Sequence, residues 1–303
     1  MEKSVICAIV KNEQRFIREW VEWHLCVGFD EINIFEDYGS VSHRDQLDDL
    51  IADGRVKLTA LSDGTTPARD LGHNNRPNGT KAAQYTIYEW FFDKTKKEGS
   101  ADWIAFIDVD EFIEFEEGYD LKRLEDEYQD RGGVLLSWKM YGANGHVKRP
   151  EGGVVESYKG KQWIAPKEDR QWAIKSLVNV HVSRGEITVH TFDGCVHTDG
   201  GGRFSPHCYD KAWINHFFTK SWEDWCDRIF SRGNMHNNYR TLDTFFLYNK
   251  DMLPQKKDMI FAKRNLHTAC TTWISRNLKI ISGGNVNLVS KLRKEYSERF
   301  VRK

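Results

Sequence analysis

Hydrophobic and polar positions follow two alternating patterns over the first third of the chain. Short apolar runs of strand length are each followed by a segment in which apolar residues recur every three or four positions, as in a helix that covers a sheet. This pattern predicts strands at 5–10, 31–35, 55–61 and 103–109, and helices at 13–28, 43–53 and 80–97. Strands that alternate with helices indicate a parallel sheet with helices on both faces.

The pattern changes after residue 133. Strand-like runs separated by glycine-containing loops follow at 134–140, 154–158, 173–182, 186–192 and 212–218, and helical patterns follow at 221–231, 241–250, about 267–279 and 285–301. We therefore expect the later strands to extend the same sheet in an antiparallel or mixed arrangement. The predicted fold is α/β, with a Rossmann-like mixed sheet flanked by helices over 1–232 and a C-terminal helical extension packed on it over 233–303.

Composition narrows the class of protein. The chain has 303 residues, a formal net charge of -1 and a pI near 6.8, so global charge gives no reason to expect nucleic acid as a partner. None of its six cysteines is spaced C-x-x-C, which argues against a zinc or thioredoxin-like motif. No signal peptide and no apolar stretch of membrane-spanning length are apparent, so we expect a cytoplasmic protein with reduced thiols.

The most informative segment is 103–112, an apolar run that ends in Asp108, Asp110 and Glu111. If the strand continues through them, Asp108 and Asp110 point to the same side, roughly 7 Å apart at Cα. Two carboxylates at the end of a buried strand are costly unless a cation neutralises them. The sequence thus predicts a Mg²⁺ or Mn²⁺ site that also binds a diphosphate. The alternative is a solvated acidic turn that caps a following helix.

The first predicted strand is followed by Lys11, Asn12 and Glu13, not by a glycine-rich turn. This argues against the G-x-G-x-x-G dinucleotide fingerprint and against a P-loop as the means of binding phosphates. A metal at the edge that carries Asp108 and Asp110 is therefore the predicted means of holding phosphates.

Several segments in this order form a characteristic set: 10–13, 19–24 with Gly28, 34–40, 103–112, Lys175 within a strand, and 214–221 before a helix. Over residues 4–232 they resemble bacterial family 2-type glycosyltransferases and, more closely, glycosyltransferase family 92. The resemblance implies a GT-A fold, a nucleotide-sugar donor, a divalent metal and inversion at the anomeric carbon. It implies an enzyme that moves a hexose from a UDP-sugar to a hydroxyl of a glycan or lipid-linked glycan, in bacterial surface polysaccharide biosynthesis.

The resemblance also carries residue roles. Asp108 and Asp110 match the D-x-D motif that holds the metal, and His216 matches a histidine that completes its coordination, with His190 and His197 as competitors. Donor binding is assigned by the same resemblance to Lys11, Asn12, Glu13, Asp37 and Asp108, with Lys175 or Arg203 pairing the diphosphate charge.

Each of these roles has a structural alternative. Glu13 suits the first turn of a helix, Asp37 a turn and His216 a hydrogen-bonded core position, while residues 200–203 suit a plain surface loop. The segment 36–40 departs from the Asp-Asn-x-Ser usual in the family at this place. The exact contact with the base is therefore open.

An inverting transferase needs a general base to deprotonate the acceptor hydroxyl. The candidates are Glu111, Asp193, Glu223 and Asp224. The last two also suit the capped first turn of a helix that begins after Ser221.

The stretch beyond Ala262 is rich in lysine and arginine. A basic helical end can dock on the inner face of a membrane, where a lipid-linked acceptor would lie, although a solvated helix face has the same composition. Two other functions remain open on the sequence alone: a metal-dependent hydrolase or nucleotidyltransferase, and a non-catalytic carbohydrate-binding protein.

Overall fold

The computed structural model describes residues 2–67, 83–160, 162–163, 173–230 and 242–249. The chain forms two compact units. The first comprises Met1–Gly142 and Gly152–Phe218, and the second comprises Ala143–Glu151 and Thr219–Lys303.

The first unit is built on a mixed sheet with the strand order β3-β2-β1-β4-β8-β6-β12-β5. Its first half is parallel and follows the predicted alternation of strands and helices. The strands are β1 (Ser4–Val10), β2 (Glu31–Glu36), β3 (Val56–Ala60) and β4 (Trp103–Phe106), and the helices are α1 (Ile17–Val27), α2 (Arg44–Ala52) and α3 (Ala83–Glu98).

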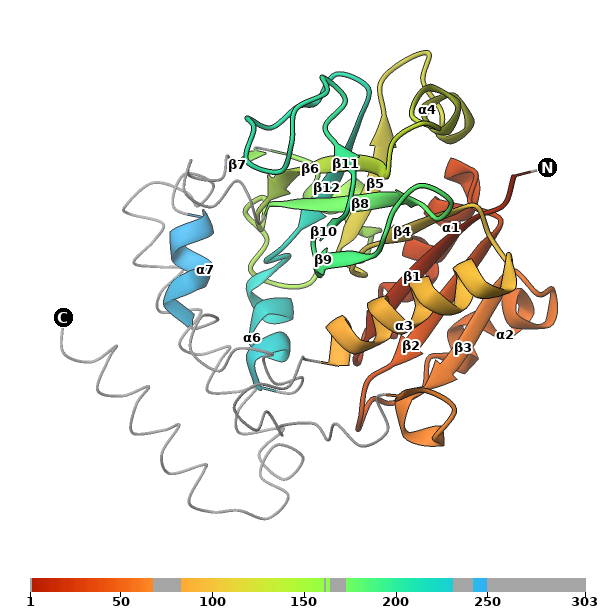
Figure 1. Cartoon of the computed structure of the whole chain (residues 1–303). Coiled ribbons are helices and arrows are strands. Elements are labelled where there is room, and N and C mark those ends of the chain that lie inside the picture. The colour runs from red at the N-terminus through yellow and green to blue at the C-terminus, as the bar shows by residue number, and fades with distance from the viewer. Residues whose placement is uncertain (1, 68–82, 161, 164–172, 231–241, 250–303) are drawn as a thin grey trace, which may run out of the picture. The chain divides into compact units, whose positions relative to one another are not determined.

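The parallel half is covered on both faces, as its alternating side chains require. Ile6 and Ala8 of β1 pack in one core with residues of α1 and α2, whereas Val5 and Cys7 of the same strand pack in a second core with residues of α3. Figure 1 shows α3 crossing one face of the sheet, over β1 and β2. A buried parallel strand is apolar on both sides, which is why the sequence reads as a continuous apolar run here.

The second half of the sheet mixes directions. β8 (Ile174–Asn179) is antiparallel to β4, β6 (Gly133–Tyr141) is antiparallel to β8, β12 (Ala212–Phe217) is parallel to β6, and β5 (Glu111–Phe115) is antiparallel to β12. The predicted α/β fold, with a mixed, Rossmann-like sheet flanked by helices, is confirmed. The smaller elements are η1 (Leu61–Asp63), α4 (Leu121–Glu127), β7 (Gln162–Trp163), β9 (Glu186–Thr188), β10 (Thr191–Phe192) and β11 (Cys195–Val196).

Three predicted strands differ from the structure. The segment 154–158 is a short helix, α5 (Val154–Tyr158), so the predicted strand was wrong. The carboxylate of Glu19, on α1, accepts the N–H groups of Val154 and Val155 and so caps this helix from a distant part of the chain. The predicted strand at 186–192 is two short strands, β9 and β10, joined by a turn.

The third difference lies at the acidic motif. The strand predicted for 103–109 ends at Phe106, and the chain turns before β5 begins at Glu111. The N–H of Glu111 donates to the carbonyl of Asp108 (3.0 Å) across this turn. The carboxylates of Asp108 and Asp110 therefore project from a turn between two strands, and strand alternation does not set their directions.

Helix α1 is fastened to the outer edge of β5 by side chains. The indole N–H groups of Trp20 and Trp23 donate to the carbonyls of Glu111 and Ile113, each at 2.7 Å. The ring of His24 accepts the N–H of Ile113 through Nε2 (3.2 Å), while its Nδ1 donates to the carbonyl of Trp20 (2.8 Å). Burial lowers the pKa of His24 to about 3, so the ring is neutral and can accept this bond. The position of β5, and of Glu111 at its start, is thereby fixed.

In the second unit the structure describes α6 (Trp222–Phe230) and α7 (Leu242–Asn249), both of which were predicted. The ring of Trp222 packs against Phe245 at 5.0 Å, and the amide of Asn249 bonds to the N–H of Ala143 (2.5 Å) and to Thr219 (3.2 Å). The helices predicted beyond residue 250 and the basic C-terminal stretch lie outside the described residues. Among those described, no helix has both the length and the apolar character to cross a membrane.

Candidate functional site

The turn between β4 and β5 brings three acidic residues to one place beside β12. His216 of β12 lies opposite Glu111 of β5 in the antiparallel register, and the N–H of Phe217 donates to the carbonyl of Asp110 (2.8 Å). This pairing sets Nε2 of His216 3.5 Å from Oδ1 of Asp110. A residue about one hundred positions further along the chain thus joins the acidic turn.

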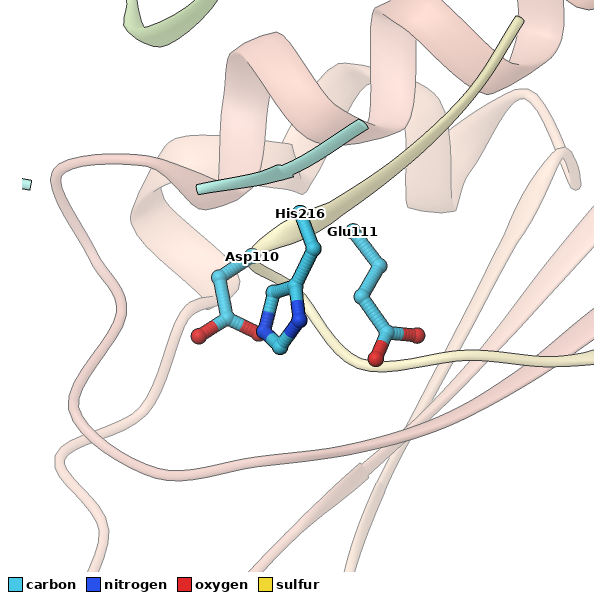
Figure 2. A group of neighbouring side chains, drawn as sticks. All are labelled: Asp110, Glu111 and His216. Carbon is cyan, nitrogen blue, oxygen red and sulfur yellow. The ribbon is translucent and has the colours of Figure 1, made fainter. Parts of the chain in front are cut away.

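Asp110, Glu111 and His216 form a group able to bind a cation. One potential ligand atom from each residue lies within 4.8 Å of the others, and the three residues are only 4 %, 0 % and 5 % exposed. Figure 2 shows their side chains extending in the same direction from the backbone. Carboxylates suit Mn²⁺ or Mg²⁺, and a neutral imidazole can complete the coordination of Mn²⁺. This geometry is compatible with the predicted metal site. The group contains Glu111, however, where the sequence had suggested Asp108.

Asp108 is held by other side chains. Its Oδ1 accepts from the amide of Gln84 on α3 (2.8 Å), and its Oδ2 pairs with the ammonium of Lys175 on β8 (3.0 Å). Burial works to raise the pKa of Asp108, but the charge and the hydrogen bond of Lys175 outweigh it and hold this pKa below the usual range. Both oxygens of Asp108 therefore have partners within the protein.

Glu111 has the opposite environment. Its Oε2 accepts the N–H of Asp108 (3.0 Å) and lies 3.9 Å from the ammonium of Lys175, but its buried Oε1 has no hydrogen-bond partner among the residues that the structure describes. Burial raises the pKa of Glu111 well above its usual value, and the negative charges of Asp108 and Asp110 add to this effect while Lys175 opposes it. A buried carboxylate oxygen without a donor is costly, and a bound cation would remove that cost. These residues therefore fit a divalent metal.

The three candidate histidines have different surroundings. Trp138 of β6 packs with its ring centroid 4.3 Å from that of His216 and 5.5 Å from that of His190. His190 bonds through Nδ1 to the carbonyl of Ile174 (3.0 Å), and burial together with the charge of Lys175 lowers its pKa to about 3. His197 is fully buried near Ser137. Of the histidines that the structure describes, His216 is the one grouped with two carboxylates.

A second polar cluster lies at the carboxyl ends of β1 and β2. We call it the β1–β2 network, and it contains the donor-site candidates Lys11, Asn12, Glu13 and Asp37. Lys11 donates to the carbonyl of Tyr38 (2.8 Å) and lies 3.8 Å from Asp37. Asn12 has a left-handed backbone (φ 54°), and its side chain accepts the N–H of Val41 (2.9 Å). The predicted donor residues are thus brought together.

His43 joins the two loops of this network. Its Nδ1 donates to Glu36 (2.9 Å), and its Nε2 accepts the N–H of Glu13 (2.9 Å). The ring is fully buried, and these two bonds fix its tautomer. Neither His43 nor Gln84 was singled out from the sequence. A histidine and a glutamine inside helical patterns carry no local signal, since their partners lie 30 and 24 positions away.

The other predicted residues have local partners. The guanidinium of Arg203 packs over Phe204, and Asp193 forms an ion pair with exposed Arg184 (2.8 Å). In the second unit, Glu223 accepts the N–H of Arg149 (3.0 Å), and Asp224 pairs with the Arg149 side chain and bonds to Ser221. The last contact, with the Asp224 N–H donating to Ser221 (3.1 Å), is the helix cap that was the alternative for these residues.

Comparison with known proteins identifies the family. Residues 3–183 match the model of Glycosyltransferase family 92, and this chain belongs to that family. Two plant members, both called glycosyltransferase family 92 proteins, come from Oryza sativa subsp. japonica (23 % identical over 246 residues) and Ricinus communis (22 % over 233 residues). Each alignment covers 75 % of this chain but only 35 % and 37 % of the two plant proteins. The chain thus matches little more than a third of their length.

Similar solved structures are more distant. S. aureus TarS is 13 % identical, with 84 % of this chain and 44 % of TarS covered at a TM-score of 0.37. Glucosyl-3-phosphoglycerate synthase from Mycobacterium tuberculosis, solved with Mn²⁺, UDP-glucose and phosphoglyceric acid, is 14 % identical, with 51 % and 46 % covered at a TM-score of 0.28. At scores this low the two structures carry no argument about the chemistry of this chain.

Proposed function

We propose that this chain is a metal-dependent, inverting glycosyltransferase that moves a hexose from a UDP-sugar to a hydroxyl of a glycan or lipid-linked glycan, as in polysaccharide synthesis. The observation that carries the proposal is the buried group of Asp110, Glu111 and His216 within a family 92 domain. Clustered buried carboxylates have no purpose in a protein that only binds carbohydrate, because their mutual repulsion costs stability.

Asp110, Glu111 and His216 would hold Mn²⁺ or Mg²⁺. Bound there, the ion supplies charge neutralisation for the departing nucleoside diphosphate. The protein's own part is to keep the three side chains together and dry, through the β5–β12 pairing and the fastening of β5 by α1. Binding through a few protein oxygens plus substrate phosphates is the usual mode for Mg²⁺.

The β1–β2 network would bind the uridine. Asp37 and Glu13 offer carboxylate acceptors for the uracil N–H or the ribose hydroxyls, and Lys11 and Asn12 shape the loop between them. The parallel strands β1, β2 and β4 all end at the same edge of the sheet, so base and diphosphate sites at their carboxyl ends would suit one extended ligand.

The general base remains to be assigned by experiment. Among the four candidates, Glu111 is proposed here as a metal ligand, and Asp224 is tied to Arg149 and Ser221. Single Asp193→Asn, Glu223→Gln and Asp224→Asn variants, compared in single-turnover transfer with donor saturating, would identify a base by a fall in rate of about 100-fold or more.

The decisive test is calorimetric binding of UDP and GDP, with and without Mn²⁺, to the wild type and to Asp110→Ala. We expect UDP to bind the wild type only with Mn²⁺ and the variant to bind no UDP. Asp48→Ala is a suitable control because it removes a solvent-exposed carboxylate of α2. Binding of nucleotide that ignores both metal and Asp110 would contradict the proposal, and metal-dependent release of UMP without an acceptor would indicate a hydrolase.

A further inference from the structure

We propose that Lys175 is a built-in counter-cation of the metal site: its ammonium holds Asp108 away from the metal-binding group and weakens the attraction of Asp110, Glu111 and His216 for a divalent cation. Lys175 is then a positioning residue, and the diphosphate partner role that the sequence suggested is replaced. The inference rests on the metal-dependent function proposed above.

The position of Lys175 is set by the sheet. It lies on β8 opposite Leu136 of β6, and the next residue, Ser176, lies opposite Phe106, the last residue of β4. The side chain of Lys175 therefore starts beside the point where the acidic turn begins. Its ammonium reaches Oδ2 of Asp108 at 3.0 Å and lies 3.9 Å from Oε2 of Glu111.

The burial of Lys175 argues against a direct role in phosphate binding. Its side chain is 1 % exposed, and the ring of Tyr88 lies 5.9 Å from its ammonium. A diphosphate could reach the ammonium only if Asp108 or the surrounding side chains moved. A lysine taken out of water needs a charged partner, and Asp108 meets that need.

The charges of the cluster show what Lys175 changes. When ionised, Asp108, Asp110 and Glu111 carry three negative charges against the one positive charge of Lys175, and the remainder matches one divalent ion. The ammonium also repels a cation placed beside Glu111, because charges a few ångströms apart in a poorly hydrated site interact strongly. Removing the charge, while leaving a hydrogen-bond donor for Asp108, should therefore tighten metal binding.

The test is a titration of the metal-free full chain with Mn²⁺ alone, with free Mn²⁺ followed by electron paramagnetic resonance. We expect Lys175→Gln to bind Mn²⁺ about tenfold more tightly than the wild type. Lys175→Arg keeps the charge and should stay within about threefold of the wild type. The Mn²⁺-induced rise in unfolding temperature should be larger for Lys175→Gln than for the wild type. Equal or weaker binding by Lys175→Gln would overturn the inference.

A double variant guards against misfolding of the single one. Asp108→Leu with Lys175→Met removes the buried ion pair as a whole, which proteins tolerate better than loss of one partner. If Asp108 is no ligand, the double variant should bind Mn²⁺ within about threefold of the wild type. Loss of Mn²⁺ binding in the double variant would overturn the inference.

The two proposals fail in different ways. If the wild type binds no Mn²⁺, even with UDP present, the proposed function itself is wrong. If the wild type binds Mn²⁺, and Lys175→Gln keeps that affinity but loses UDP at saturating Mn²⁺, the function stands and Lys175 is a phosphate ligand, which would overturn the inference.

Discussion

The two polar clusters at the carboxyl ends of the strands differ in how their hydrogen-bonding groups are used. In the β1–β2 network, His43 uses both ring nitrogens, and Asn12 and Lys11 bond to backbone groups of the neighbouring loop. In the acidic turn, Glu111 has a buried oxygen with no donor within the described part of the chain. In the first cluster these side chains join the two loops to each other, whereas the second stores an unfavourable arrangement of buried charges that a ligand can relieve.

Glu111→Gln should give the largest effect, because it removes a ligand charge where the cluster is incomplete. We expect kcat/KM for sugar transfer to fall at least about 100-fold. The metal-free variant should nonetheless unfold at a higher temperature than the wild type at pH 8, because a buried charge is gone. Assays with Mn²⁺ and calorimetric melts without it would show both changes. A variant that lost stability together with activity would show that Glu111 is structural.

His43→Ala should mainly cost stability, because it removes the ring that joins the two loops of the β1–β2 network. We expect a loss of about 2–3 kcal/mol in the free energy of unfolding, from the emptied volume and the unpaired Glu36 and Glu13 groups. Urea denaturation would measure it. His181→Ala is a matched control, because the His181 ring is exposed and bonds to Asp102 at the surface; it should change stability by less than about 0.5 kcal/mol. Equal effects of the two variants would mean that the network contributes nothing.

Glu125 is a buried carboxyl group outside the acidic turn, so it shows what burial does to stability. It lies on α4 and accepts from the hydroxyl of Ser4 (2.5 Å), and burial raises its pKa to about 7 from 4.5. A raised carboxyl pKa means that the proton stabilises the fold, so the stability of the wild type should fall as the pH rises from about 4.5 through about 7. Glu125→Gln should therefore exceed the wild type by on the order of 2 kcal/mol at pH 8, and match it near pH 4. Urea denaturation at the two pH values would test this, and a pH-independent difference would contradict it.

Arg184→Ala should have the smallest effect. The pair of Arg184 with Asp193 is at the surface, where Arg184 is 85 % exposed, so we expect a change of less than about 0.5 kcal/mol in the free energy of unfolding. A larger loss in thermal or urea melts would mean that the β9–β10 turn depends on this pair.

The sequence predicts well those parts of the fold that depend on neighbouring residues. It predicts poorly those parts that depend on residues far away in the chain. The order of strands and helices in the parallel half was predicted correctly because each carries its own hydrophobic period, although β4 ends at Phe106, before the predicted end at residue 109. The segment 154–158 was assigned wrongly because a short apolar run does not distinguish strand from helix, and the helix depends on Glu19, which lies 135 positions away.

The candidate site shows the same limit. The acidic motif and His216 were singled out from the sequence, but the grouping of Glu111, in place of Asp108, with Asp110 and His216 was not. That grouping depends on Lys175, 67 positions from Asp108, and on Gln84, whose contacts exist only once β8 and α3 have packed beside the turn. The sequence shows which side chains can be charged. The folded structure is needed to show which of these charges are paired with one another.

The bonds from α1 to the edge of β5 also bear on how the chain is made. An uncovered strand edge can pair with another molecule, and the indoles of Trp20 and Trp23 occupy that edge. Their acceptors lie 91 and 90 positions later in the chain, so during synthesis two large indoles emerge from the ribosome long before β5 exists to receive them. Until then the nascent chain exposes apolar surface of the kind that chaperones bind. The helix that secures β5 in the folded protein is thus a segment at risk of aggregation while the chain is being synthesised.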